Sequence, residues 1–195
     1  MYRHVYKRLL DVVLSIMGLI VCFLPMLVIA LAIKLDSKGP IIFQQERLGR
    51  KEKHFVVYKF RTMVNRAYEK GGLATRSDDP RITRVGAFLR RNSLDELPQL
   101  INIIKGDMSI IGPRPILPWE FDEYRDNPVY RKRHNALPGL FCTVDIKLRA
   151  AADREIQFKM DSDYVEHISF ANDIKIFFGV IKTVLSGKNV YREEV

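Results

Sequence analysis

Apolar positions are unevenly distributed along the chain, with one continuous run near its start and shorter, interrupted patterns after it. Residues 12–33 read VVLSIMGLIVCFLPMLVIALAI, a stretch of about 22 residues without a charged side chain, and ~20 apolar residues suffice for a helix to cross a bilayer. No small-x-small cleavage pattern follows, which favours a retained helix over a signal peptide. We therefore predict a membrane-anchoring helix hairpin over residues 1–38, a surface domain over residues 39–186 and a C-terminal tail over residues 187–195.

Pro25 interrupts the apolar run near its middle. A proline inside a helix removes a backbone hydrogen bond and clashes with the carbonyl four residues earlier, so it kinks or breaks the helix. Basic residues flank the run on both sides, and such flanks favour the cytoplasmic face. They are Arg3, Lys7, Arg8, Lys34, Lys38, Arg47 and Arg50. A re-entrant helix with both ends on the cytoplasmic face satisfies both flanks, whereas a kinked span is the alternative, because membrane helices tolerate proline.

Two short apolar patterns follow, at residues 41–45 and 55–60. Leu48-Gly49-Arg50 lies between them and carries a turn signal, so we predict a β-hairpin at the membrane edge. The next stretch, residues 65–80, is polar, contains Gly71-Gly72 and has no period. It is therefore predicted to be a loop.

Helical periodicity returns in four places downstream. Residues 85–91 combine one apolar face with cationic positions. The next helix is predicted to begin at residues 93–95, because Pro98 is comfortable only in a first turn. Residues 154–167 and 173–185 carry two more helical patterns, the second of which either closes the core or lies on the membrane. These elements predict an α+β, mainly helical fold with a re-entrant N-terminal membrane helix, amphipathic interfacial helices and a small β-hairpin.

A cluster of aromatic and cationic residues lies between the second and third of these helical patterns. Trp119, Phe121 and Tyr124 precede the run Tyr130-Arg131-Lys132-Arg133-His134. This mixture suits an amphipathic helix at a membrane interface, and an ordinary exposed helix is the alternative. His134 is a candidate proton carrier, although a surface histidine in a basic run is more often a bystander.

The composition points to an anionic partner. The chain has 195 residues, a net charge of +9 and a pI near 9.6, which suits nucleic acid, an anionic membrane or a phosphorylated substrate. No nucleic-acid module and no Gly-x-x-x-x-Gly-Lys phosphate loop is present in the sequence, so we expect no nucleic-acid partner. Cys22 and Cys142 are far apart, which supports neither a disulfide framework nor a Cys-x-x-Cys metal site.

The adjacent carboxylates Asp95 and Glu96 are the candidate chemical centre. Four arginines precede the pair in the sequence, and one arginine between two prolines follows it. They are Arg81, Arg84, Arg90, Arg91 and, in Gly112-Pro113-Arg114-Pro115, Arg114. At a helix N-terminus the macrodipole and free backbone donors favour ionised carboxylates and bound phosphate, and an ionised aspartate is a competent nucleophile toward phosphorus. Ser93-x-x-Glu96 is also a helix capping box, and a cap and a site can coexist.

Several motifs in the same order resemble the bacterial sugar transferase family, the small monotopic phosphoglycosyl transferases. They are Lys59-Phe60-Arg61-Thr62-Met63, Asp79-Pro80-Arg81-Ile82-Thr83, Arg90 with the stretch from Ser93 to Leu100, Lys105-Gly106-Asp107-Met108-Ser109, and Gly112-Pro113-Arg114-Pro115. The resemblance covers residues 1 to about 140. It implies a re-entrant helix and a catalytic domain on the cytoplasmic face of the bacterial inner membrane.

The resemblance also implies roles for single residues. Asp95 matches a nucleophile that attacks the β-phosphorus of a UDP-sugar, releases UMP and holds a phosphosugar that passes to polyprenyl phosphate. Glu96 matches its acidic partner, and the two carboxylates would hold the Mg²⁺ that the family needs. An alternative within the same class is direct transfer, with Asp95 only a magnesium ligand. The alternative outside it is a non-enzymatic, membrane-anchored basic protein that binds an anionic partner.

Four cations are the candidates for phosphate contact. Arg90 and Arg114 match arginines whose planar forks would bind phosphates in bidentate fashion, while Arg114 could instead be a turn residue locked between two prolines. Lys59 and Arg61 are the other candidates, and a solvated basic face is their alternative role. Membrane lipid and a second copy of the chain, in a homodimer, complete the predicted partners.

The chain departs from the family pattern in two places. In residues 138–149 a glycine is replaced by Cys142, a glutamine by Asp145 and a second glycine by Leu148. Because glycine reaches backbone conformations that other residues largely cannot, we expect a different loop path there. At the membrane break this chain has Leu24-Pro25 where many members have Ser-Pro.

Overall fold

The computed structural model describes residues 1–67, 79–147 and 153–185 of the chain, which are mainly helical with two small two-stranded sheets. The helices are α1 (Lys7–Asp36), α2 (Arg84–Arg91), α3 (Gln99–Lys105), α4 (Pro128–Arg131), α5 (Thr143–Lys147), α6 (Arg154–Glu166) and α7 (Phe170–Leu185). The strands are β1 (Ile42–Leu48), β2 (His54–Phe60), β3 (Ser109–Ile111) and β4 (Gly139–Phe141). A π-helical turn (Tyr2–Tyr6) and four 3-10 turns complete the described structure: Arg50–Glu52, Leu94–Glu96, Pro118–Tyr124 and Lys132–Asn135. Most of the predicted loop at 65–80 and the predicted tail lie outside the described residues.

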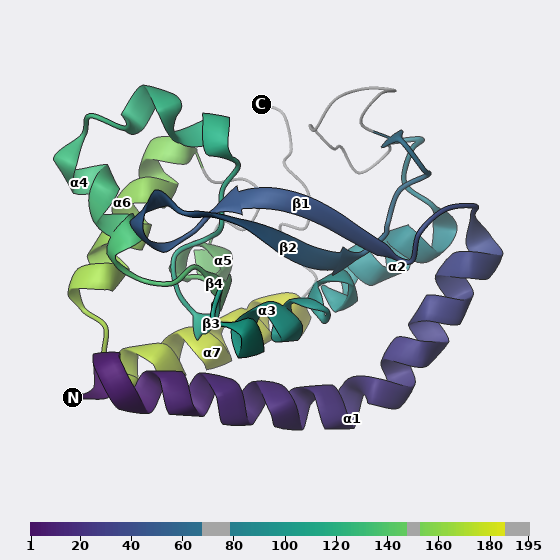
Figure 1. Cartoon of the computed structure of the whole chain (residues 1–195), viewed down its shortest axis with the longest axis horizontal. Coiled ribbons are helices and arrows are strands. Elements are labelled where there is room, and N and C mark those ends of the chain that lie inside the picture. The colour runs from purple at the N-terminus through teal and green to yellow at the C-terminus, as the bar shows by residue number, and fades with distance from the viewer. Residues whose placement is uncertain (68–78, 148–152, 186–195) are drawn as a thin grey trace.

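α1 is one bent helix, and Figure 1 shows its first part along the lower edge and its second part rising at the right. Pro25 lies inside it, and proline is an established cause of helix bends. Among the described residues α1 alone is long and apolar enough to cross a membrane, judged by length and composition. Much of its surface is open, since Val21 is 76% and Leu24 is 68% exposed. The predicted apolar helix is confirmed, and its re-entry stays a prediction.

Both limbs of α1, before and after the proline, are tied to the same domain. In the first limb Asp11 accepts a hydrogen bond from Ser109 Oγ on β3 at 2.7 Å, and Arg8 donates to carbonyls at the C-terminal end of α3. In the second limb Asp36 accepts from the backbone N–H of Val85 at the start of α2, at 3.1 Å. The bend therefore lets one helix follow the domain from β3 to α2.

β1 and β2 form the predicted antiparallel hairpin, drawn above α1 in Figure 1. Ile42 lies opposite Phe60 and Leu48 opposite His54, so the first strand continues past the predicted end at Gln45. The twisted ribbon starts near the C-terminal end of α1 and runs across the domain toward its opposite end.

The outer edge of β2 is covered by one side chain of α3. The amide of Asn102, which is fully buried, accepts from Tyr58 N at 3.0 Å and donates to Val56 O at 2.6 Å. These two bonds replace those of a neighbouring strand. They also set α3, and the turn that precedes it, in register with β2.

A second, parallel sheet joins distant segments and was not predicted. Ser109 pairs with Gly139 and Ile111 with Phe141. Tyr164 of α6 packs on this sheet, and its hydroxyl donates to Ile111 O at 3.2 Å. The strands β3 and β4 have three residues each, too few for a sequence period to reveal them.

The aromatic and cationic cluster around residue 120 does not form one continuous helix, and its predicted place at a membrane interface stays a prediction. The segment forms separate short helices that pack against α6, and Figure 1 places α4 and α6 at the left, above α1. Phe121 is fully buried and meets Phe158 edge to face at a ring distance of 5.6 Å, although Trp119 is exposed. Arg133 and His134 are also buried. Burial lowers the pKa of His134 to about 4, so this histidine is not the surface bystander that was expected.

The Gly86→Ala variant is expected to lose about 2 kcal/mol of stability, because a Cβ there would lie 2.0 Å from the backbone oxygen of Thr62. That oxygen cannot move aside without shifting α2 away from β2. Gly18→Ala is the matched control, since its nearest neighbour is a side-chain methyl of Leu100 at 3.2 Å. Urea denaturation of both variants in detergent, followed by circular dichroism, measures the difference. Equal losses in the two variants would contradict the close approach of α2 to Thr62.

Candidate active site

Asp95 and Glu96 lie in the 3-10 turn Leu94–Glu96, between α2 and α3. The leucines on either side, Leu94 and Leu97, pack against the apolar cluster that contains Phe60. Both carboxylate residues remain half-buried. Packing of these two leucines therefore holds the turn in place on both sides of the carboxylate pair, and the pair itself stays partly exposed.

The capping box predicted at this turn does not form. Ser93 has a φ of 55°, in the left-handed region, and its side chain makes no capping bond to the turn. The Glu96 carboxylate instead forms an ion pair with Lys59 of β2, with Nζ and Oε1 2.6 Å apart. α3 begins only at Gln99, with Pro98 as its N-cap, so the predicted helix start was several residues early.

Opposing effects act on the Asp95 carboxyl. Burial, the largest effect, raises its pKa, and the neighbouring Glu96 raises it further. Lys59 and Arg90 lower it by favouring the carboxylate. We expected a helix N-terminus to favour the ionised form of Asp95. The geometry instead makes the two cations the groups that offset the cost of burying the charge, and a carboxyl with a raised pKa is a more basic, stronger nucleophile once ionised.

Arg90 and Arg61 have different surroundings, although both were candidates for phosphate contact. Arg90 Nε donates to Thr62 Oγ1 at 2.9 Å, and the guanidinium acts electrostatically on Asp95. Arg61 is 5% exposed and donates to three carbonyl oxygens at and just beyond the end of α1, at 2.5 to 3.2 Å. Arg61 therefore holds the C-terminal end of α1, a position that favours a cation.

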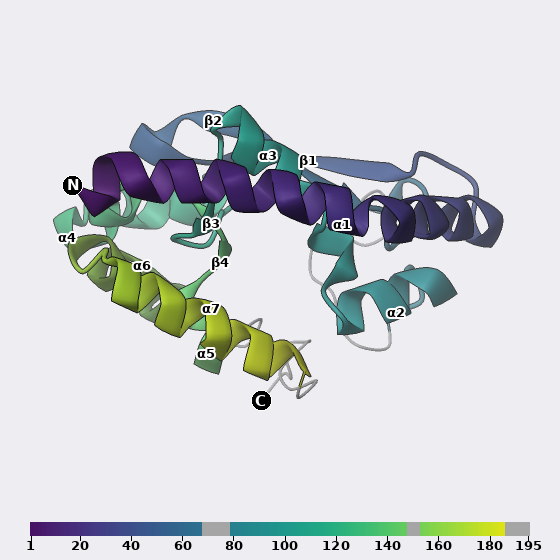
Figure 2. The ribbon, with the colours of Figure 1, turned by 90° about the horizontal axis from the view of Figure 1, so that it is seen from below.

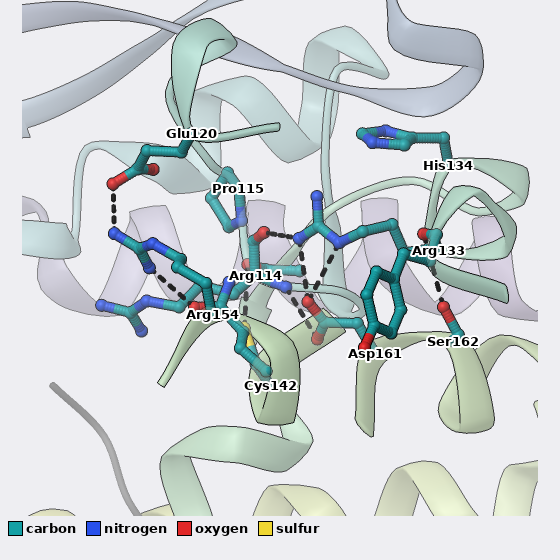
Figure 3. Close-up of polar contacts among 12 residues, drawn as sticks. Arg114, Pro115, Glu120, Arg133, His134, Cys142, Arg154, Asp161 and Ser162 are labelled. Carbon is teal, nitrogen blue, oxygen red and sulfur yellow. Dashed lines mark hydrogen bonds and ion pairs between the residues drawn. The ribbon is translucent and has the colours of Figure 1, made fainter. Parts of the chain in front are cut away.

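Arg114 is held at both its backbone and its side chain (Figure 3). Its N–H donates to Asp161 at 3.2 Å, and its carbonyl accepts from Arg133 at 2.5 Å. Its Nη1 forms an ion pair with Asp145 Oδ1 at 2.6 Å. Asp145 raises the pKa of Arg114, with a smaller contribution from Glu96. Arg114 therefore interacts electrostatically with Glu96, while its direct partner is Asp145.

Arg47 is a site residue that the sequence analysis treated only as a flanking charge. It lies on β1, donates to Pro115 O at 3.3 Å and approaches Glu120 at 4.0 Å. Burial lowers its pKa to about 10, opposed by Glu120 and, more weakly, by Glu96. Arg154 of α6 also pairs with Glu120, as Figure 3 shows. No local sequence signal connects these residues, because β1, the 3-10 turn that carries Glu120, and α6 meet only in the fold.

The carboxylate pair has the oxygen donors that a magnesium ion shared with a substrate would need. The described part of the chain contains no group of three or more His, Cys, Asp or Glu side chains placed to hold a metal. Mg²⁺ is commonly bound through one or two carboxylates together with substrate phosphates. Asp95 and Glu96 supply such a pair, and one oxygen of Glu96 is already paired with Lys59.

The site therefore combines a carboxylate pair with nearby cations, on a domain bonded to a long apolar helix, which suits a phosphate-containing substrate. The family model described as bacterial sugar transferase matches residues 2–187, and the chain belongs to this family. It is 39% identical to the exopolysaccharide production protein PSS of Rhizobium leguminosarum bv. phaseoli, over 93% of this chain and 96% of that protein.

Longer relatives carry more specific names. The chain is 37% identical to UDP-N-acetylgalactosamine-undecaprenyl-phosphate N-acetylgalactosaminephosphotransferase of Aeromonas hydrophila, over 93% of this chain and 44% of that protein. It is 41% identical to UDP-glucose:undecaprenyl-phosphate glucose-1-phosphate transferase of Escherichia coli, over 90% and 39% of the two chains. The chain thus spans less than half the length of these two relatives.

Proposed function

We propose that the chain is a phosphoglycosyl transferase that moves a sugar 1-phosphate from a UDP-sugar to undecaprenyl or another polyprenyl phosphate, the first membrane step of glycan or exopolysaccharide assembly. The observation that carries this proposal is the position of Asp95, half-buried between Lys59, Arg90 and Glu96. The names of the longer relatives supply the donor and acceptor classes.

The proposed chemistry has two displacements at one phosphorus. In the first, an Asp95 oxygen attacks the β-phosphorus of the UDP-sugar, and the bond to the bridging oxygen breaks, so that UMP leaves with the electron pair. In the second, a phosphate oxygen of the acceptor attacks the same phosphorus, and the Asp95 carboxylate is expelled. The products are UMP and a polyprenyl diphosphosugar, and the enzyme returns to its initial state.

Cations around the turn would hold the donor's phosphates. Arg90 is held by Thr62, and its charge acts on Asp95, while Arg114 is held by Asp145. Their guanidinium groups would stabilise the charge that develops on the phosphoryl oxygens. Magnesium bound by Asp95, Glu96 and the donor would offset the repulsion between the carboxylates and the diphosphate.

The anchor is proposed to re-enter the cytoplasmic leaflet of the bacterial inner membrane rather than to cross it. Both limbs of α1 bond to the same domain, through Asp11 in the first limb and Asp36 in the second. A straight crossing would carry one limb away from the domain, and basic residues flank both ends. The bent helix supports a domain that rests on the cytoplasmic face.

Release of UMP by the purified chain, incubated with polyprenyl phosphate, magnesium and each of a set of UDP-sugars, tests the proposed function. We expect UMP release that is lost on adding EDTA and restored by excess Mg²⁺. A non-enzymatic anchored protein would release no UMP from any donor, and UMP release that survives EDTA would contradict the proposed use of magnesium.

The Lys59→Gln variant is expected to move the acid limb of the pH–rate profile to higher pH. Lys59 lowers the pKa of Asp95, so its loss raises that pKa, and the nucleophile becomes ionised only at higher pH. The measurement is kcat/KM for the UDP-sugar against pH. Lys53→Gln in the exposed hairpin turn is the control, and equal acid limbs for the two variants would show that Lys59 does not act on the nucleophile.

A further inference from the structure

An open apolar groove separates the second limb of α1 from α2, two elements that Figure 2 shows side by side. Its volume is about 470 Å³. Its apolar lining comes from both helices: Val28, Ile29, Ala32, Val85, Phe88 and Leu89. Arg84 at the start of α2 is the charged residue among its walls. Phe88 is 60% and Val28 is 62% exposed, which leaves large apolar side chains facing outward.

The groove is continuous with the packing that holds the carboxylate pair. Ile29, Val85 and Leu89 belong to the same apolar cluster as the leucines on either side of Asp95 and Glu96. The residue after Leu89 is Arg90, whose charge acts on Asp95. α2 therefore presents apolar side chains to the groove and a cation to the carboxylate from neighbouring positions.

From this juxtaposition we propose that the groove binds the isoprenoid chain of the acceptor lipid, an inference that rests on the proposed transferase function. The acceptor is an amphiphile whose phosphate must reach the phosphorus on Asp95 while its hydrocarbon chain stays out of water. Arg90 complements the charge of the phosphate, and in α2 it directly follows Leu89, a residue of the groove wall. The groove also opens next to the apolar outer surface of α1, so the rest of the chain can continue into lipid.

The full chain in nanodiscs tests this inference through the Phe88→Ser variant. Phe88 is exposed, so its removal should leave the fold intact. We expect KM for undecaprenyl phosphate to rise about tenfold, the order expected when part of an apolar contact of this size is lost. Phe178→Ser on α7 is the matched control, because Phe178 is 62% exposed and lies outside the groove. KM for geranyl phosphate, whose chain is too short to follow the groove, should change much less.

A second variant and a competitor make the test decisive. Ala32→Trp fills the groove from α1 and should raise KM for undecaprenyl phosphate in the same way. Dioleoylphosphatidic acid, which has a phosphate head but acyl chains, should compete weakly. The inference is overturned if both groove variants keep the KM of the control, if Phe178→Ser raises KM equally, or if the acyl lipid competes as well as undecaprenyl phosphate binds. Failure of the proposed function would look different: the unmodified chain would release no UMP with donor and acceptor present.

Discussion

The Asp95→Asn variant is expected to lose UMP release from a UDP-sugar by at least about a thousandfold, the order seen when a nucleophile is removed from an enzyme. Asparagine keeps the shape of the side chain but cannot attack phosphorus to form the covalent adduct. The measurement is the steady-state rate of UMP release at saturating donor and acceptor.

Stability separates this loss of chemistry from a loss of fold. Because burial raises the pKa of Asp95, the ionised carboxylate costs the folded state free energy, and a neutral amide should leave the melting temperature unchanged or higher. Asp163→Asn, at an exposed carboxylate on α6, is the control and should keep full turnover. An Asp95→Asn protein that retains a tenth of the unmodified rate would contradict the nucleophile assignment.

The Asp161→Ala variant is expected to lose about 3–5 kcal/mol of stability, the typical cost of leaving one member of a buried ion pair alone. Asp161 and Arg133 have side chains that are 1% and 2% exposed, with Nη2 and Oδ2 2.8 Å apart. Figure 3 shows Asp161 bonded to the backbone of Arg114 as well. The variant should therefore also disturb the backbone of Arg114. Urea denaturation in detergent gives the free energy of unfolding.

An exposed ion pair on the same two elements is the control for this effect. Lys132 and Glu166 are 45% and 49% exposed at the side chain, and Glu166→Ala should cost little, because water screens such pairs. Replacing both buried partners, Arg133→Met with Asp161→Leu, should recover much of the lost stability. If Asp161→Ala and Glu166→Ala lowered the free energy of unfolding equally, the buried pair would contribute no more to stability than the exposed pair.

Elements with a strong local pattern were predictable from the sequence. The apolar run of α1, the hairpin and the helix at 85–91 all have a period or a turn signal that acts within a few residues. The parallel pair β3–β4 has neither, since its pairing depends on contacts between Ser109 and Gly139. Phe121 was misplaced for a related reason, because the aromatic and cationic residues around it suggested an amphipathic interfacial helix, and its burial depends on the distant Phe158.

The candidate site was predictable where its members share a motif. Asp95, Glu96 and Arg90 are close in sequence, and Lys59 joins them because Asn102 aligns α3 with β2. The contacts of Arg47, Arg61 and Arg114 could not be predicted, because their partners lie on other elements. Asp145 was visible only as a departure from the family pattern, and in the fold it forms an ion pair with Arg114. The catalytic and metal-binding roles of these residues stay predictions.

Intact-protein mass spectrometry tests for the covalent intermediate on Asp95 that the proposed chemistry requires. The purified chain is incubated with magnesium and a UDP-sugar that it turns over, without acceptor. We expect a mass increase of one phosphosugar that is absent from Asp95→Asn and disappears when polyprenyl phosphate is added. An unchanged mass, in a preparation that releases UMP once acceptor is supplied, would rule out the covalent intermediate and indicate direct transfer.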